Sequence, residues 1–360
     1  MHPIPLPRIS DLLHLANSRK TDHADWKIEK YVKSPWFCSG AESLLNICNQ
    51  LSKDTKDVYL MLPAYFCGQS LRYLRGAGVN FIFYNLYDDL TPNYEHIEQL
   101  LCDKQSDIFL HVHYFGCVSS QRDSRELCDK HNMVMVEDCA HVIHPSIHGM
   151  WLGDYIFFSP HKYFPVNHAG IVFSKKKLTI NALYREESFP FLWYLKRLVK
   201  RHILSNVKIK GCDWSVKWNS QSNLSKFLTP NSIEIDLLKI KSINIHDLSN
   251  KRMKNKDMLL NTLRLFDKWE LMSNFGENNV PYVLGMRCES EAIASNLFLK
   301  FRSCNCPVMM WPDLPFELKV LSRNYKSDVD RVKVNIFFFL HEQIEINKYL
   351  KLIKKVLNEK

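Results

Sequence analysis

Residues 157–170 of the chain read FFSPHKYFPVNHAG. In this stretch Lys162 follows an aromatic run and a Ser-Pro-His sequence, and it leads into a turn of small residues. A lysine at such a place is, taken alone, most often a charged surface residue. The sequence on either side decides whether Lys162 has another role, because it indicates the fold in which this lysine lies.

Short apolar runs alternate with helical patterns from about residue 36 to residue 175. The apolar runs are residues 58–63, 80–85, 108–115, 133–139, 155–159 and 170–174. Apolar residues recur at three- and four-residue spacing in residues 40–53, 68–78, 93–104 and 122–132. Such spacing is typical of amphipathic helices, and the alternation predicts an α/β domain whose mostly parallel sheet carries helices on both faces.

The second half of the chain indicates a smaller unit. Helices are expected near residues 233–267, 289–302 and 342–357, and strands over residues 280–288 and 330–340. The polar stretch 219–232 has the composition of a linker. We therefore expect an N-terminal arm (1–35), a large α/β domain (36–218), and a linker with a small C-terminal α+β domain (219–360).

Composition limits the cellular setting that we expect. A chain of 360 residues with 46% hydrophobic content can bury two cores. The 11 cysteines show no CxxC pair, and the first residues do not resemble an export signal, so we expect reduced thiols and a cytoplasmic protein. No apolar stretch reaches the about 20 residues that span a bilayer, so no transmembrane segment is expected.

The formal charge of +10 indicates an anionic partner without identifying it. Much of the excess lies in residues 193–210 and 239–256, which we interpret as helices with one solvated face. The aromatic and basic stretch 189–202 could instead lie on a membrane surface or pack on a partner. Nucleic acid, a membrane surface and a phosphorylated small molecule would each attract such a charge, and charge alone does not choose among them.

Polar residues follow the expected strands where a ligand would bind. In an open parallel sheet, ligands lie outside the carboxyl ends of the strands. Asp138 follows one apolar run, Ser159, His161 and Lys162 follow the next, and the first helix opens with SGAES at 39–43. Pyridoxal phosphate needs a lysine for its aldehyde, a carboxylate for its ring nitrogen, and a helix N-terminus with hydroxyls for its phosphate.

Six motifs occur in an order that resembles a known family. They are SGAESLL (39–45), LPAYFCG (62–68), HYFG (113–116), VEDCAH (136–141), GDYIFFSPHK (153–162) and AGIVFS (169–174). In this order they resemble the DegT/DnrJ/EryC1/StrS sugar aminotransferases, which are pyridoxal-phosphate enzymes of fold type I. The resemblance covers roughly residues 35–175, and residues 306–315 and 337–343 agree with it weakly.

The resemblance implies roles for the residues around the cofactor ring. It makes Lys162 the residue that forms the Schiff base with the cofactor, and it makes Asp138 the partner of the pyridine nitrogen. His141 corresponds to a glutamine or histidine that contacts the phenolic oxygen. Either Tyr65 or Phe66 corresponds to the region that stacks on the ring, and the sequence does not decide between them.

The phosphate-binding residues depart from the family pattern. Gly40, Ala41 and Glu42 correspond to the phosphate-binding turn, where the family usually has threonine in place of Ala41. Ser159 stands three residues before the lysine instead of five, which resembles the Ser-x-His-Lys arrangement of the cysteine desulfurase relatives. We therefore expect Ser159 and His161 to contact the phosphate in a rearranged site.

The resemblance also implies the reaction. An amino group from an amino acid, which we expect to be L-glutamate, would pass through the cofactor to a nucleotide-linked keto-sugar in a ping-pong reaction, as in amino-sugar and polysaccharide biosynthesis. The resemblance thus implies phosphorylated small-molecule ligands and no nucleic acid. Relatives that act as dehydratases have histidine in place of the lysine, so Lys162 favours amino transfer. A homodimer with shared active sites is implied as well.

Other interpretations remain open at this stage. A cysteine desulfurase or lyase of the same fold would need a mobile thiolate, for which Cys304 or Cys306 is a candidate. A basic binding protein that has kept the fold without catalysis is a third possibility. His111 and His113 alternate along an expected strand, but their surroundings lack the spacing of a zinc site, and we expect no metal.

Overall fold

The computed structural model describes most of the chain. The described residues are 5–7, 25–34, 36–52, 57–147, 150–167, 169–178, 190–202, 215–222, 239–266, 269–272, 279–321 and 324–358.

A sheet of seven strands forms the large domain. Its strands are β1 (Val32–Lys33), β2 (Tyr59–Pro63), β3 (Asn80–Tyr84), β4 (Ile108–Val112), β5 (Val134–Cys139), β6 (Tyr155–Phe158) and β7 (Ile171–Ser174). Their order is β1-β7-β6-β5-β4-β2-β3, with β2 to β6 parallel and β7 antiparallel to both neighbours. Strands β4 to β7 are buried over nearly their whole length, which explains their continuous apolar runs.

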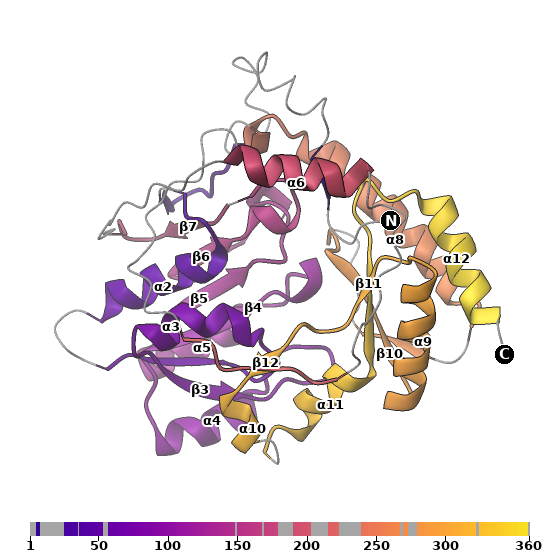
Figure 1. Ribbon diagram of the computed structural model, residues 1–360. Coiled ribbons are helices and arrows are strands. Elements are labelled where there is room, and N and C mark those ends of the chain that lie inside the picture. Colours follow the sequence, from indigo (N-terminus) through magenta and orange to yellow (C-terminus); the bar gives the residue numbers. More distant parts are fainter. Residues whose placement is uncertain are drawn as a thin grey trace.

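Helices connect the parallel strands. They are α2 (Gly40–Leu51), α3 (Arg72–Gly76), α4 (Tyr94–Asp103) and α5 (Arg122–His131), with the short 3₁₀ turns η1 (Gly68–Leu71), η2 (Tyr114–Gly116), η3 (Pro145–Ile147) and η4 (Pro160–Lys162). Helix α6 (Pro190–His202) crosses above both domains in Figure 1. Asparagine or serine side chains cap α2 and α4, because Ser39 accepts from the N–H of Glu42 and Asn93 from that of His96.

The small domain contains an antiparallel sheet in the order β11-β13-β10-β9. Its strands are β9 (Trp269–Leu271), β10 (Val283–Cys288), β11 (Val308–Met309) and β13 (Asn335–Phe339), and its helices are α8 (Ile245–Leu263), α9 (Glu291–Ser303), α10 (Glu317–Val320), α11 (Lys326–Val334) and α12 (Ile346–Asn358). Figure 1 shows α8, α9 and α12 on the side away from the large sheet. The predicted α/β class with a smaller α+β domain is confirmed.

Some expected elements differ in the structure. The strand expected over 330–340 is wrong for residues 330–334, which belong to α11, because this helix buries Val329 and Val332 on one face. The run 108–115 ends as a strand at Val112, since Phe115 and Gly116 have φ angles of 56° and 90° and turn the chain.

Three expected segments lie partly beyond the described residues. Within the expected N-terminal arm, β1 pairs with β7 at the edge of the large sheet. Of the expected linker 219–232, Asn219 lies in β8 (Trp218–Asn219), which pairs with β12 (Leu314–Pro315), and residues 223–232 lie outside the described part. The basic stretch 193–210 is helical to His202, and its remainder lies outside that part as well.

Buried contacts fasten the small domain to the large one. Arg331 of α11 donates hydrogen bonds to the carbonyl oxygens of Leu86 and Tyr87, just beyond β3, and pairs with Asp328 on its own helix. The hydroxyl of Tyr325 donates to the carbonyl of Phe83 at 2.8 Å. These bonds hold the end of β3 against the small domain and thereby fix the position of the two domains at this contact.

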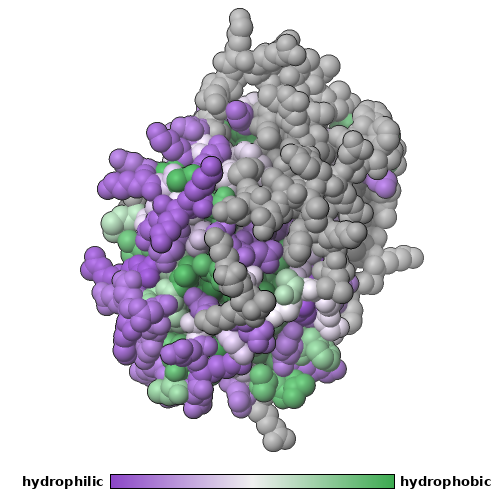
Figure 2. Space-filling view, turned by 90° about the vertical axis from the view of Figure 1, so that its left-hand side faces the viewer, coloured by the Kyte–Doolittle hydropathy of each residue, from purple (hydrophilic) through white to green (hydrophobic). Residues whose placement is uncertain are grey.

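The outer surface is mixed in character. Hydrophilic side chains cover much of the coloured face in Figure 2, and hydrophobic groups gather on it in separate areas. Among the helices that the structure describes, none is both long and apolar enough to cross a membrane.

Candidate active site

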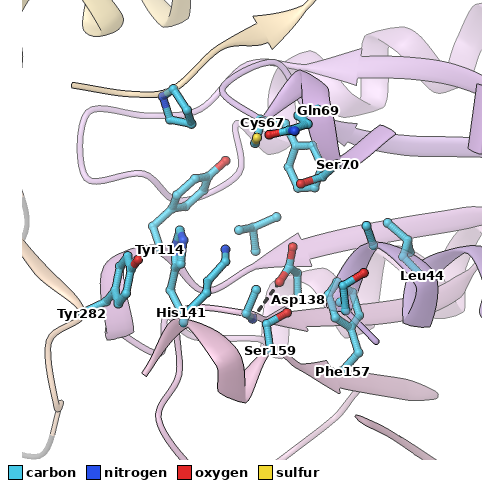
Figure 3. A pocket seen from close by; sticks show the side chains of 18 of the residues that line it. Leu44, Cys67, Gln69, Ser70, Tyr114, Asp138, His141, Phe157, Ser159 and Tyr282 are labelled. Carbon is cyan, nitrogen blue, oxygen red and sulfur yellow. Dashed lines mark hydrogen bonds between the residues drawn. The ribbon is translucent and has the colours of Figure 1, made fainter. Parts of the chain in front are cut away.

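A cavity of about 400 Å³ lies outside the carboxyl ends of β5 and β6. Figure 3 shows it between the segment that follows β2 and the ends of these two strands. The side chains on its two walls are Cys67, Gln69 and Ser70 on the first and Asp138, His141 and Ser159 on the second. Tyr114 and Tyr282 lie toward one end, and Leu44 and Phe157 lie toward the other.

Asp138 lies at the centre of the cavity wall. It is in register with Val112 on β4 and Phe157 on β6, so all three side chains share the face of the sheet that lines the cavity. One carboxylate oxygen, Oδ1, accepts the N–H of Ala140 at 2.8 Å, which orients the group. Lys162 enters the same cavity from η4, directly after the neighbouring strand β6.

Asp138 and Lys162 influence each other's protonation. Burial raises the pKa of Asp138, and the positive charge of Lys162 opposes this effect. Burial lowers the pKa of Lys162, and the negative charge of Asp138 opposes this effect. The lowered pKa increases the fraction of neutral amine, which is the nucleophilic form of lysine.

The imidazole ring of His141 stacks on two aromatic rings. It is nearly parallel to those of Phe115, 5.8 Å away between centroids, and Tyr282, 4.9 Å away. Its Nδ1 accepts the N–H of Phe115 at 3.4 Å. Burial, and next the charge of Lys162, hold the pKa of His141 well below its usual value. The neutral ring therefore carries its proton on Nε2, which remains available to donate into the cavity.

The N-terminus of α2 closes the end of the cavity near Ser159. A Cβ on Gly40 would lie 2.1 Å from the Oγ of Ser159, so only glycine allows this hydroxyl to approach the first turn. Ser159 is 3% exposed, and its hydroxyl makes no hydrogen bond to any residue that the structure describes. Gly170 also allows a close approach to the start of α2, since a Cβ there would lie 2.5 Å from the carbonyl oxygen of Ser39.

This arrangement fits pyridoxal phosphate. In the first turn of α2 the N–H of Glu42 is capped by Ser39, whereas those of Gly40 and Ala41 have no acceptor within the helix, and the unpartnered hydroxyl of Ser159 faces Gly40, as an anion site requires. The carboxylate of Asp138 and the amine of Lys162 lie in the same cavity, where the cofactor's ring nitrogen and aldehyde need them.

Eight of the ten predicted site residues line the cavity. They are Gly40, Ala41, Phe66, Asp138, His141, Ser159, His161 and Lys162. His161 is oriented by its Nδ1, which lies 2.9 Å from the carbonyl oxygen of Ala169.

The remaining two residues lie outside the cavity lining. Glu42 turns back along α2 and accepts the N–H of Cys38 at 3.3 Å, while its own N–H donates to Ser39; this is a capping box whose return bond goes to the residue before the N-cap. Tyr65 is fully buried and stacks on Trp311 with a centroid distance of 4.3 Å. Of the two aromatic candidates for the cofactor ring, only Phe66 reaches the cavity.

The sequence interpretation missed several lining residues. They are Cys67, Gln69, Ser70, Arg72, Tyr114, Tyr282 and Trp311. The first four follow the carboxyl end of β2, so the rule that selected residues after strands could have been extended to them. Tyr282 and Trp311 come from the small domain, and no local pattern indicates that they reach the cavity.

The candidate desulfurase cysteines do not line the cavity. Cys306 is 2% exposed, and burial raises the pKa of its thiol to about 12. The cavity thiol is Cys67, whose Sγ donates to Asp313 Oδ1 at 3.2 Å. Burial and Asp313 raise the pKa of Cys67 to about 11, so it is protonated near neutral pH.

A polar cluster lies on the opposite face of β5. Potential metal-ligand atoms of His113, Glu137 and Cys139 lie within 4.8 Å of one another. The Oε2 of Glu137 lies 2.9 Å from Nε2 of His113, and its Oε1 accepts the N–H groups of Leu152 and Gly153. Oε1 thereby anchors the loop before β6, and Oε2 is engaged by His113 and by the side-chain amide of Gln121.

Comparisons with known proteins place this geometry in a family. The model of the DegT/DnrJ/EryC1/StrS aminotransferase family matches residues 37–209. No curated protein sequence matches the chain.

Solved structures share the fold at low identity. Helicobacter pylori PseC, an aminotransferase involved in the biosynthesis of pseudoaminic acid, is 11% identical with a TM-score of 0.67, over 100% of this chain and 99% of that one. The PLP form of the putative sugar aminotransferase Spr1654 from Streptococcus pneumoniae is 14% identical with a TM-score of 0.64, over 99% and 98%. The ntda protein of Bacillus subtilis, with bound cofactor PMP, is 12% identical with a TM-score of 0.67, over 98% and 83%. The fold and the family model agree, and residues 37–209 of the chain match the DegT/DnrJ/EryC1/StrS aminotransferase family.

Proposed function

We propose that the protein is a pyridoxal-phosphate aminotransferase that transfers an amino group from an amino acid to a nucleotide-linked keto-sugar. The observation that carries this proposal is the presence of Lys162 and Asp138 in one cavity that ends at the N-terminus of α2. The match of residues 37–209 to an aminotransferase family, together with the retained Lys162, supports the reaction class.

Each part of the cofactor has a matching group in the cavity. Lys162 would hold the aldehyde, Asp138 the protonated ring nitrogen, and Nε2 of His141 would donate to the phenolic oxygen. The phosphate would accept from the N–H groups of the first turn of α2 and from Ser159, with Phe66 against the ring. When bound, pyridoxal phosphate supplies an electron sink for negative charge on the substrate's amino-bearing carbon.

Lys162 would also move the proton. Its amine lies in the cavity, and its lowered pKa lets it act as a base and then as an acid there. Asp138 would remain ionised beside a positively charged ring nitrogen, because an adjacent opposite charge lowers the pKa of a buried carboxyl group. The tyrosine and tryptophan side chains at the mouth would limit the access of water.

The acceptor and the assembly follow from the family. A diphosphate-bearing keto-sugar suits a chain with a formal charge of +10. The cavity of about 400 Å³ lies at the small end of the range for ligand sites, so the nucleotide would extend beyond it. We expect a homodimer in which the second chain completes this outer part. Every cysteine that the structure describes is a free thiol, which suits a cytoplasmic enzyme.

A spectral titration tests the function. The purified protein with added cofactor should show a yellow absorbance band, which L-glutamate should convert to the spectrum of the pyridoxamine form. A nucleotide-linked keto-sugar should then restore the first spectrum. Sulfide released from cysteine would select the desulfurase reaction instead, and no band at all would select a non-catalytic binding protein.

A further inference from the structure

We propose that Arg72 binds the phosphate of the cofactor and replaces the hydroxyl that is lost at Ala41. This inference rests on the proposed function, since it assigns a residue to the phosphate end of the same cavity. Arg72 opens α3, two residues after Ser70, and its side chain lines the cavity together with Gly40 and Ala41 of α2.

The guanidinium of Arg72 is held in place beside α2. Its Nη2 donates to the hydroxyl of Tyr73 at 2.6 Å, and its central carbon lies 4.4 Å from the centroid of the Tyr73 ring. Burial and the charge of Glu42 on α2 raise the pKa of the Tyr73 hydroxyl, and helix α3 packs against α2. The tyrosine therefore fixes the cation close to the first turn of α2.

The charge of Arg72 is not neutralised within the described part of the protein. None of the described carboxylates forms an ion pair with it, and its buried Nε has no hydrogen-bond partner there. Arg75, one turn later, provides a contrast, because it forms a two-pronged pair with Glu317 at 2.6 and 2.9 Å. A guanidinium with free donors in a half-buried position is suited to a phosphate ligand.

A second hydrogen-bond donor at this end of the cavity, the hydroxyl of Ser159, also has no acceptor among the described residues. Ser159 is a buried residue whose hydroxyl faces Gly40. Lys162 is the other cationic amine or guanidinium group among the described lining residues, and the cofactor's aldehyde would engage it. Arg72 thus supplies the positive charge that a doubly charged phosphate needs, and Ala41 does not need a hydroxyl.

The test compares pyridoxal phosphate with pyridoxal, which lacks the phosphate. Protein freed of its cofactor is titrated with each compound, and dissociation constants are measured from the absorbance band. Arg72→Gln should weaken the binding of pyridoxal phosphate about 10- to 100-fold, the range for a lost charge-assisted hydrogen bond. The same variant should change pyridoxal binding by less than about twofold, since pyridoxal cannot contact this residue.

Two further variants make the result specific. Arg72→Lys keeps the positive charge but cannot donate two parallel hydrogen bonds as a guanidinium does. Its loss of pyridoxal-phosphate affinity should therefore be smaller than that of Arg72→Gln. Arg264→Gln removes an exposed arginine at the end of α8 and should leave both affinities unchanged, which controls for net charge. Thermal unfolding of each variant shows whether the fold is intact.

Three outcomes would overturn the inference. Equal losses for both compounds would show that Arg72 supports the fold of the cavity. Unchanged cofactor affinity with a raised KM for the nucleotide-linked sugar would show that Arg72 binds the substrate and not the cofactor's phosphate. In both cases the wild-type band persists, so the proposed function survives. A wild-type protein that forms no band with either compound would contradict the proposed function itself, and this inference with it.

Discussion

Asp138 and Lys162 come from the carboxyl ends of two neighbouring parallel strands, and each shifts the other's pKa inside one cavity. The pair is formed by topology, because β5 and β6 lie side by side although 24 residues separate the two side chains in the sequence. This relationship gives the proposed chemistry its two essential groups.

Replacing Asp138 by asparagine should separate binding from catalysis. The amide has nearly the same shape but cannot hold a proton on the ring nitrogen, so the cofactor should lose its strength as an electron sink. We expect the Asp138→Asn variant to bind pyridoxal phosphate and to transaminate about 100-fold more slowly or worse. Single-turnover absorbance measurements with L-glutamate would check this, and near-normal rates would speak against the role of Asp138.

Adding a methyl group at Gly40 should weaken the phosphate end of the cavity. The new Cβ would lie 2.1 Å from the Oγ of Ser159 and would force this hydroxyl away from α2. We expect Gly40→Ala to raise the dissociation constant of pyridoxal phosphate about tenfold, as the loss of one charge-assisted hydrogen bond does.

The double variant Gly40→Ala with Ser159→Ala serves as its control. Ser159→Ala removes the clashing oxygen, so adding Gly40→Ala to it should have little further effect on the affinity. The two changes should therefore be strongly non-additive. Simple additivity of the two losses would mean that the hydroxyl and the first turn of α2 act on different parts of the ligand.

Buried His144 should make the protein less stable in acid. Burial lowers its pKa to about 4, and its Nδ1 accepts both the hydroxyl and the N–H of Ser146. The folded state therefore disfavours protonation, whereas an unfolded histidine titrates near 6.5. The unfolded state binds more protons between these values, so stability is lost as the pH falls from about 6.5 to 4.

His144→Asn should reduce this acid sensitivity. The asparagine oxygen can accept the N–H of Ser146 as Nδ1 does, but it does not titrate. Denaturant unfolding of both proteins at pH 7 and pH 4 should show that the variant loses about 3 kcal/mol less free energy of unfolding over this interval. An identical loss in the two proteins would show that His144 does not contribute.

The cysteine variants test the desulfurase alternative. Cys304 and Cys306 do not line the cavity, and Cys306 is buried with a raised pKa. Alanine at Cys304 should therefore leave transamination within about twofold of the wild-type rate, as surface substitutions usually do. A loss of activity in this variant, together with sulfide release from cysteine by the wild type, would favour the desulfurase reaction.

The sequence indicated those parts of the fold that depend on local pattern. The runs for β2, β5 and β6 lie within a residue of the observed strands, because fully buried parallel strands are continuous apolar segments. The prediction of a strand over 330–340 was wrong for residues 330–334, which are helical. The first residues of this segment alternate like a strand, and only packing of α11 against the small domain selects the helix.

The candidate site was predictable to a similar extent. Asp138 lies at the end of one strand and Lys162 follows the next, and motif order singles both out. The capping box formed by Ser39 and Glu42 could be read from the spacing Ser-x-x-Glu, which would have moved Glu42 away from the ligand. Arg72 could not be found in this way, because its free charge depends on which carboxylates lie near it in space.

The most direct measurement of the central claim is to locate the covalent bond. Protein loaded with pyridoxal phosphate is reduced with borohydride, digested, and analysed by peptide mass spectrometry, with Lys162→Ala as the matched control. The account predicts a phosphopyridoxyl group on Lys162 and no such adduct in the variant. An adduct on another lysine, or a Lys162→Ala protein that still transaminates at the wild-type rate, would contradict it.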